Sequence, residues 1–141
     1  YKRQVEVRGD GDAARRKEVV RRRLAFDSDP EGYTESVGEE TESVRSRIAD
    51  ARAALPGVTV PDGILDAVVE ITTHFGVDGH RADITMLKAA RANAALEGRY
   101  EVGADDIRAV ATSVLSHRMR RRPFEEKVFD PEELETCLKG I

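Results

Sequence analysis

Four segments of the chain repeat apolar residues at helical spacing, and each segment is apolar along one side only. A 3.6-residue period of this kind predicts an amphipathic helix. Such a helix must bury its apolar side against other helices, so the sequence predicts an all-α fold, a small helical bundle. The four apolar stripes are Val44, Ile48, Ala51 and Leu55; Ile64, Val68, Ile71 and Phe75; Ile84 and Leu87; and Ile107, Val110, Ala111, Val114 and Leu115.

Turn residues set the limits of these four helices. The first covers about 39–55 and is followed by a Pro-Gly pair. The second is entered through Pro61 and is ended by Gly76, because glycine readily takes the left-handed conformation found just after a helix. The third covers roughly 79–97 and the fourth about 104–119.

A short fifth helix is predicted at about 130–139, where Leu134 and Leu138 share a face. The third helix is rich in alanine, whose small side chain lets neighbouring helices approach closely. We therefore expect the third helix to lie at the centre of the bundle. Its alanines include Ala89, Ala90, Ala92, Ala94 and Ala95.

The first part of the chain has a different character. Residues 1–8 alternate polar and apolar side chains like a β-strand, although no second convincing strand follows. We expect them to be the end of an element of a larger protein. Residues 12–26 predict a helix that Asp12 caps, with a dense arginine side. Contact with another subunit is the favoured role of that side, and solvated charge or nucleic-acid contact stay open. Residues 28–38 resemble a linker.

Composition excludes several classes of protein. No apolar run approaches the roughly 20 residues that a membrane helix needs, and no secretory leader is recognisable. The protein is therefore expected to be cytoplasmic, with no membrane partner. Cys137 is the single cysteine, which excludes an internal disulfide framework and a cysteine-clustered zinc site. The net charge of −4 gives no support for wholesale nucleic-acid binding.

Side chains that carry chemistry are sparse. The three histidines, His74, His80 and His117, include no pair four residues apart, so no metal site is expected. Neither GxxxxGK[ST] nor GxGxxG occurs, and any main nucleotide pocket lies elsewhere. The basic cluster at 117–127 follows a helix end, where the helix dipole favours cations. Nucleic acid is therefore not the expected partner of this cluster.

Arg81 stands in an unfavourable place. If Asp78 caps the third helix, Arg81 falls near the third helical position, where the positive end of the helix dipole repels a guanidinium by roughly 0.3–1 kcal/mol. A bound phosphate would remove this penalty, since helix amides and an arginine fork together suit its oxygens. An ion pair with a carboxylate of the preceding helix, such as Glu70 or Asp66, is the alternative.

Two runs of sequence carry a resemblance to a known family. They are GVDGHRADITMLKAARANAALEGRYEV, from Gly76, and DDIRAVATSVLSHRMRRRPFE, from Asp105. Both closely resemble the C-terminal part of the AAA+ ATPase subunit of magnesium chelatase. The earlier run QVEVRGDGDAARRKEVVRRRLAFDSDP, from Gln4, is similar to that family's passage from its ATPase core into the helical region.

The resemblance implies three regions. Residues 1–8 would end the last strand of an AAA+ core. Residues 9–58 would hold the basic helix, the linker and an insertion helix that precedes sensor 2. Residues 59–141 would form the four-helix AAA+ lid with a C-terminal tail. Arg81 matches the sensor-2 arginine, which contacts the ATP phosphates at a subunit boundary.

The implied function is that of a nucleotide-sensing lid in a motor subunit that couples ATP hydrolysis to Mg²⁺ insertion into protoporphyrin IX, in chlorophyll biosynthesis. ATP and Mg²⁺ would serve the full-length protein, and none is expected bound to this piece. The implied partners are its own core, neighbouring subunits in a ring, commonly a hexamer, and the integrase-like and porphyrin-binding subunits.

The Walker A and Walker B segments and the core arginine finger have no counterpart, so no catalytic residue is assigned and the piece alone should be inactive. A lid from a cobaltochelatase or a MoxR-like remodelling ATPase is the first alternative reading. A free-standing helical adaptor that binds nucleic acid is the second.

Overall fold

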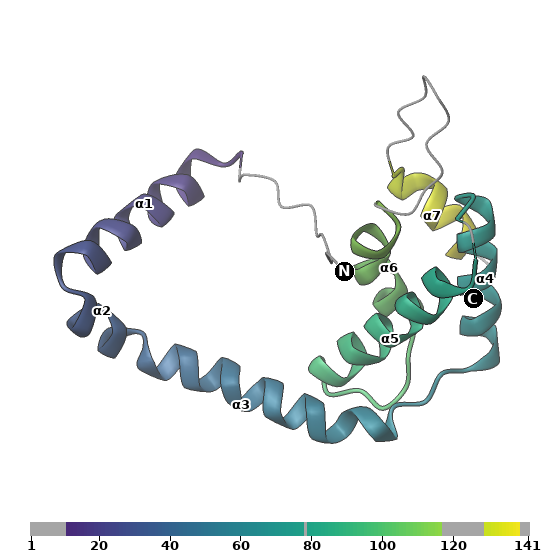
Figure 1. Cartoon of the computed structure of the whole chain (residues 1–141), viewed down its shortest axis with the longest axis horizontal. Coiled ribbons are helices and arrows are strands. Elements are labelled where there is room, and N and C mark those ends of the chain that lie inside the picture. The colour runs from purple at the N-terminus through teal and green to yellow at the C-terminus, as the bar shows by residue number, and fades with distance from the viewer. Residues whose placement is uncertain (1–10, 78, 117–128, 139–141) are drawn as a thin grey trace. The chain divides into compact units, whose positions relative to one another are not determined.

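The structure is a computed structural model that describes residues 11–77, 79–116 and 129–138. Within these ranges the chain is helical and contains no strand, which confirms the all-α bundle (Figure 1). The strand expected at 1–8 lies outside the described residues. The elements are α1 (Ala13–Ser28), α2 (Pro30–Ser36), α3 (Gly38–Ala54), the 3₁₀ helix η1 (Leu55–Gly57), α4 (Asp62–His74), α5 (Arg81–Leu96), α6 (Ala104–Leu115) and α7 (Pro131–Leu138).

The described chain divides into two compact units, residues 11–48 and residues 49–138. The division into regions 9–58 and 59–141 stays a prediction. The first unit begins with α1, where the Asp12 side chain accepts a hydrogen bond from the Ala14 amide at 2.9 Å. This contact confirms Asp12 as the cap of the first helix.

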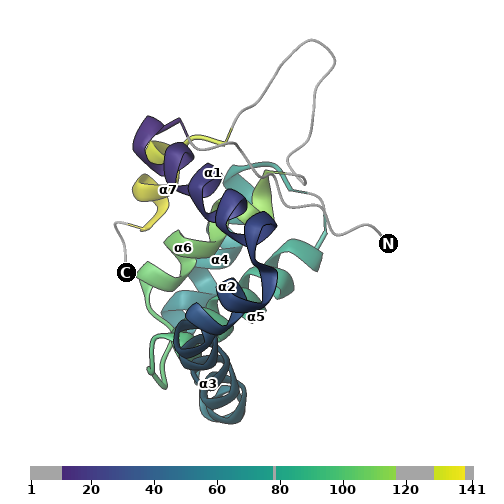
Figure 2. The ribbon, with the colours of Figure 1, turned by 90° about the vertical axis from the view of Figure 1, so that its left-hand side faces the viewer.

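The predicted linker at 28–38 is wrong, because it contains helix α2. A bend leads from α1 into α2 (Figure 2). At this bend the Asp29 side chain accepts a hydrogen bond from the Gly32 amide at 3.0 Å. Pro30 takes the first helical position, where its missing N–H is no loss. An Asp-Pro pair is thus a helix start here rather than a break.

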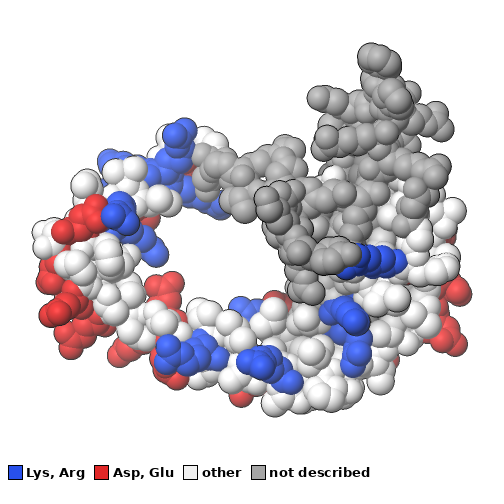
Figure 3. Space-filling model, in the orientation of Figure 1, with Lys and Arg blue, Asp and Glu red and all other residues white. Residues whose placement is uncertain are grey.

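Charged side chains cover the first unit. Basic residues gather over α1, and acidic residues gather over α2 and the start of α3 (Figure 3). The Glu18 carboxylate accepts hydrogen bonds from the guanidinium groups of Arg21 at 2.8 Å and Arg22 at 3.1 Å. The Arg23 guanidinium lies 2.8 Å from a carboxylate oxygen of Asp27. The arginine side of α1 is therefore partly neutralised by carboxylates of the same helix.

The apolar stripe of α3 is buried only at its end. Ala51 is buried and Leu55, in η1, packs against the core, whereas Val44 and Ile48 are 54% and 47% exposed. The expectation that the whole stripe is covered is therefore wrong for the described residues. The helical period predicts which face of a helix is apolar, but it does not predict that every turn of that face packs against another element.

The second unit holds the core. The stripe of α4 is buried as predicted, and Leu134 and Leu138 of α7 are buried against the same core. Helix α6 buries most of its predicted stripe and ends at Leu115, earlier than expected. The buried residues of α4 and α6 are Ile64, Ala67, Val68, Ile71, Thr72, Asp106, Ile107, Ala111, Val114 and Leu115.

Helix α5 packs through a stripe in which three of four residues are alanine. Ala82, Met86, Ala90 and Ala94 follow one another at four-residue spacing and are fully buried. Ile84, which was predicted to lead the buried stripe, is exposed. The small side chains let α6 lie close to α5, and η1 and α4 contact α5 as well. The central position predicted for this helix is confirmed.

Glycines with positive φ end two of the core helices. Gly76 has φ +64° after α4, and its amide donates to the Thr73 carbonyl at 3.0 Å. Gly98 has φ +71° after α5. Helix α5 begins at Arg81 itself, so Arg81 is the first helical residue and not near the third.

Candidate functional site

Arg81 is the first residue of α5 and is exposed. The position before it is His80, which makes no side-chain capping bond to the helix. Asp78, the expected cap, lies outside the described residues. The helix start thus brings backbone amides and an exposed arginine to one place, and such a place suits an anion.

Glu70 and Asp66, the carboxylates considered as alternative partners of Arg81, are both exposed on α4. Their exposure means that neither is a buried countercharge inside the bundle.

A second feature of this helix start is Asp83. Its side chain is only 17% exposed, and its Oδ2 lies 3.5 Å from Nδ1 of His80. Its Oδ1 is buried and has no hydrogen-bond partner within the described residues. A buried acceptor that lacks a partner costs about 1–3 kcal/mol, and such groups are rare without a reason. The start of α5 therefore has an acceptor two residues after Arg81 that the described residues do not satisfy.

The other end of α5 is fixed by a buried carboxylate that the sequence reasoning missed. Asp106, in the first turn of α6, is fully buried. It accepts hydrogen bonds from the Arg99 guanidinium at 2.6 and 2.7 Å, from the Asn93 amide at 2.8 Å and from the Gly103 N–H at 2.9 Å. Four donors on two oxygens join the end of α5, the following loop and the start of α6.

These contacts set the charge of the pair. Burial opposes ionisation of Asp106, but the hydrogen bonds from Arg99, Gly103 and Asn93 outweigh it, so its pKa lies below the usual value. The same hydrogen bond raises the pKa of Arg99. Both groups are therefore charged at neutral pH, and the pair is an ion pair.

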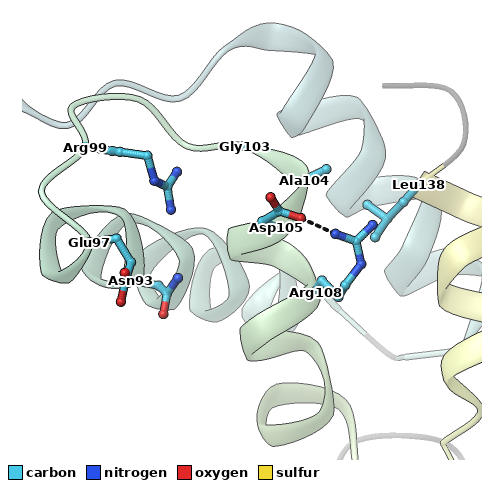
Figure 4. A pocket seen from close by; sticks show the side chains of 8 residues that line it. All are labelled: Asn93, Glu97, Arg99, Gly103, Ala104, Asp105, Arg108 and Leu138. Atoms are coloured by element: carbon cyan, nitrogen blue, oxygen red, sulfur yellow. Dashed lines mark hydrogen bonds and ion pairs between the residues drawn. The ribbon is translucent and has the colours of Figure 1, made fainter.

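An open pocket of about 600 Å³ lies beside this ion pair. Asn93, Glu97 and Arg99 line one side, and Leu138 of α7 lies on the other (Figure 4). Arg108 also lines the pocket. Its guanidinium forms ion pairs with Asp105 and with Glu135, and its two hydrogen bonds to Glu135 are 2.5 and 2.9 Å long. Both arginines of the pocket already have carboxylate partners, so the pocket is no ready anion site.

Arg91 fixes the middle of α5. It is partly buried, and its Nε donates to the Val58 carbonyl at 3.1 Å, while one terminal nitrogen donates to the Leu55 carbonyl at 2.9 Å. These carbonyls belong to η1 and its cap, directly after α3. No sequence pattern predicts this contact, because its partners are backbone atoms more than thirty positions away.

No group of side chains within 11–77, 79–116 and 129–138 could hold a metal ion. His74 lies 3.2 Å from Glu133, and His80 contacts Asp83. His117 and the basic cluster at 117–127 lie outside the described residues. Among the described helices, none combines the length and apolarity that crossing a bilayer requires.

Cys137 is buried on α7. Burial, together with the nearby carboxylates Glu70 and Glu133, raises the pKa of its thiol. A buried thiol with a raised pKa is a poor nucleophile. Cys137 thus belongs to the core.

Known proteins resemble this chain along most of its length. The "Magnesium-chelatase 38 kDa subunit" of Cereibacter sphaeroides is 45% identical over 122 residues, which is 86% of this chain and 36% of that protein. The "Magnesium-chelatase subunit ChlI homolog" of Methanocaldococcus jannaschii is 37% identical over 134 residues, 95% of this chain and 37% of that protein. The chain thus spans little more than a third of these relatives.

A longer relative is also similar. The "Uncharacterized protein Rv2850c" of Mycobacterium tuberculosis is 36% identical over 134 residues, 95% of this chain and 21% of that protein. These likenesses confirm the resemblance to magnesium chelatase ATPase subunits.

The AAA lid domain family matches residues 65–137, which include α5 with Arg81 and the Asp106 ion pair. Its match falls on the helices that form the buried core of the second unit. The chain belongs to the AAA lid domain family.

Proposed function

We propose that the chain is the nucleotide-sensing lid of the ATPase motor subunit of magnesium chelatase, and that Arg81 is its sensor-2 residue. The observation that carries this proposal is an exposed arginine at the first residue of α5. A phosphate at this place would receive bonds from both the arginine fork and the helix amides. The similarity to magnesium chelatase subunits supports the choice of motor.

In the full-length protein, Arg81 would contact the terminal phosphate of ATP bound with Mg²⁺ in a pocket on the ATPase core. Hydrolysis or phosphate release removes the bidentate contact, and the lid then shifts against the core. A ring of such subunits would pass this movement to the integrase-like and porphyrin-binding subunits. The overall reaction would be ATP-dependent insertion of Mg²⁺ into protoporphyrin IX, a step of chlorophyll synthesis.

The second candidate is a lid from a cobaltochelatase or a MoxR-like remodelling ATPase. A similar lid also occurs in the longer uncharacterised protein of Mycobacterium tuberculosis, of which this chain covers 21%, so this type of lid is not restricted to proteins of the length of the 38 kDa subunits. The role of Arg81 would be the same in either motor, but the metal and the partners would differ.

The test is Arg81→Ala in the full-length protein. We expect nucleotide binding to stay within a modest factor and most ATP hydrolysis to be lost, because the contact forms chiefly with the reacting phosphate. Arg81→Lys should also be impaired, since a lysine keeps the charge but lacks the planar fork. Lys88→Ala, at an exposed site on the same helix, is the matched control. Near-normal turnover in Arg81→Ala would refute the sensor role.

A further inference from the structure

Helix α5 carries two arginines with different surroundings. Arg81 lies at its exposed start, and Arg91 lies ten residues later, about 15 Å along the axis at 1.5 Å per residue. Arg91 is partly buried and donates to the carbonyls of Leu55 and Val58 at 2.9 and 3.1 Å. The helix that begins at the proposed nucleotide contact is thus bonded, at mid-length, to the segment that follows α3.

The Arg91 contact fixes direction as well as distance. Carbonyls at a helix end lack partners within the helix. The Leu55 carbonyl accepts one bond from the Val58 amide at 3.3 Å and a second from Arg91. Because the guanidinium is planar and holds its donors in a fixed fork, two bonds to two carbonyls restrict rotation of η1 against α5.

A second attachment holds the same segment. The Thr59 amide donates to the Tyr100 carbonyl at 2.9 Å, and the Val102 amide donates to the Thr59 carbonyl at 3.1 Å. Residues 100–102 lie in the loop that directly follows α5. Residues 55–59 are therefore attached to α5 at its middle and to the loop after its end, so they must move with that helix.

We propose that Arg91 is a positioning residue that transmits movement of α5 to the end of α3, so that the nucleotide state read at Arg81 changes the backbone at 49–58. The proposal rests on the proposed sensor role of Arg81. It assigns Arg91 to coupling and not to nucleotide contact, since its guanidinium is engaged by the η1 carbonyls.

Hydrogen exchange measured by mass spectrometry on the full-length protein tests this coupling. Exchange rates are compared between the protein bound to a non-hydrolysable ATP analogue and the protein bound to ADP. Two peptides are followed, 79–88 and 49–58. In the unaltered protein we expect both peptides to exchange at different rates in the two nucleotide states. In Arg91→Ala the difference should persist at 79–88 and fall at least threefold at 49–58. Lys88→Ala should keep both differences.

A purely structural role would lower protection at 49–58 equally in both nucleotide states and leave the difference between them intact. That result, or an unchanged difference in Arg91→Ala, overturns the proposal. If Arg91→Ala does not fold, Arg91→Lys carries the test, because an ammonium can still bond one carbonyl but lacks the fork. Its difference at 49–58 must fall by at least half, and an unaltered value overturns the coupling.

The unaltered protein separates the two proposals. Equal exchange at 79–88 with both nucleotides contradicts the sensor role of Arg81. A clear difference at 79–88 with none at 49–58 leaves the sensor role standing and overturns the coupling alone.

Discussion

Replacing Asp106 by Asn should destabilise the lid strongly, because the site offers only donors. Asp106 accepts four hydrogen bonds, two at each carboxylate oxygen. An amide group in either orientation points its NH₂ at two of these donors. Hydrogen bonds to charged groups contribute about 1.5–3 kcal/mol each. The Arg99 side chain is 42% exposed and can turn to water, so its share of the loss is smaller.

We therefore expect Asp106→Asn to lower the free energy of unfolding of this chain by about 2–4 kcal/mol, mostly from the donors of Asn93 and Gly103 that lose a charged acceptor. For a chain of this length such a loss lowers Tm by roughly 10 °C. Urea and thermal unfolding followed by circular dichroism measure both quantities. Asp105→Asn is the control, since the Asp105 side chain is 89% exposed. It should change stability by less than about 0.5 kcal/mol.

The effect of Asp106→Asn should also depend on pH. The pKa of Asp106 is depressed in the folded state, so its contribution is complete above the unfolded value of about 4 and is lost as pH falls through the lower folded value. The stability difference between the two proteins should be constant from pH 5 to 8 and shrink below about pH 4. Equal stability of Asp106→Asn and Asp105→Asn at neutral pH would refute the reasoning.

Two further predictions concern backbone and thiol. Gly76→Ala should destabilise the chain by about 1–2 kcal/mol, because φ is +64° there, whereas Gly63→Ala, in open space within α4, should stabilise it by about 0.5–1 kcal/mol. Urea unfolding measures the change in the free energy of unfolding for both variants, and equal changes would contradict this prediction. Because its thiol is buried and its pKa is raised, Cys137 should react with a thiol reagent at pH 8 at least about tenfold more slowly than in the urea-unfolded chain. Prompt reaction of the native chain would mean that α7 is not held as described.

Much of the fold could be predicted because its signals are local. The stripe of α4 and the pair Leu134 and Leu138 need only helical period, and Gly76 needs only the chemistry of a helix end. The cap at Asp12 is a contact across two residues. Features that depend on residues only a few positions apart can be predicted from the neighbouring sequence.

Other features depend on contacts that no local pattern records. The period placed Ile84 in the core, but the buried stripe of α5 includes Ala82 and Met86, each two residues from Ile84, and Ile84 lies outside it. Asp106 and Arg99 are joined across a loop and belong to no shared helical face. Helix α2 was missed because Asp29 and Pro30 stand both at turns and at helix starts, and only the bond to Gly32 distinguishes the two.

The candidate site divides in the same way. Arg81 is proposed from its sequence position, since an arginine at a helix start is electrostatically unfavourable without an anion. The buried oxygen of Asp83 and the bonds from Arg91 to η1 required coordinates, because burial and backbone acceptors have no sequence signature. The position of a candidate residue in its helix can thus be inferred from the local sequence, but the contacts it makes with distant segments cannot.

The buried stripe of α5 has a mechanical consequence. Alanine has no χ angles, so three of the four buried positions, Ala82, Ala90 and Ala94, have no alternative rotamers with which to absorb a push from a neighbour. Close-packed interiors are also poorly compressible. A force applied at one end of α5 would therefore displace the helix as a stiff rod rather than dissipate in side-chain rearrangement, and methionine at Met86 is the single flexible element along that line.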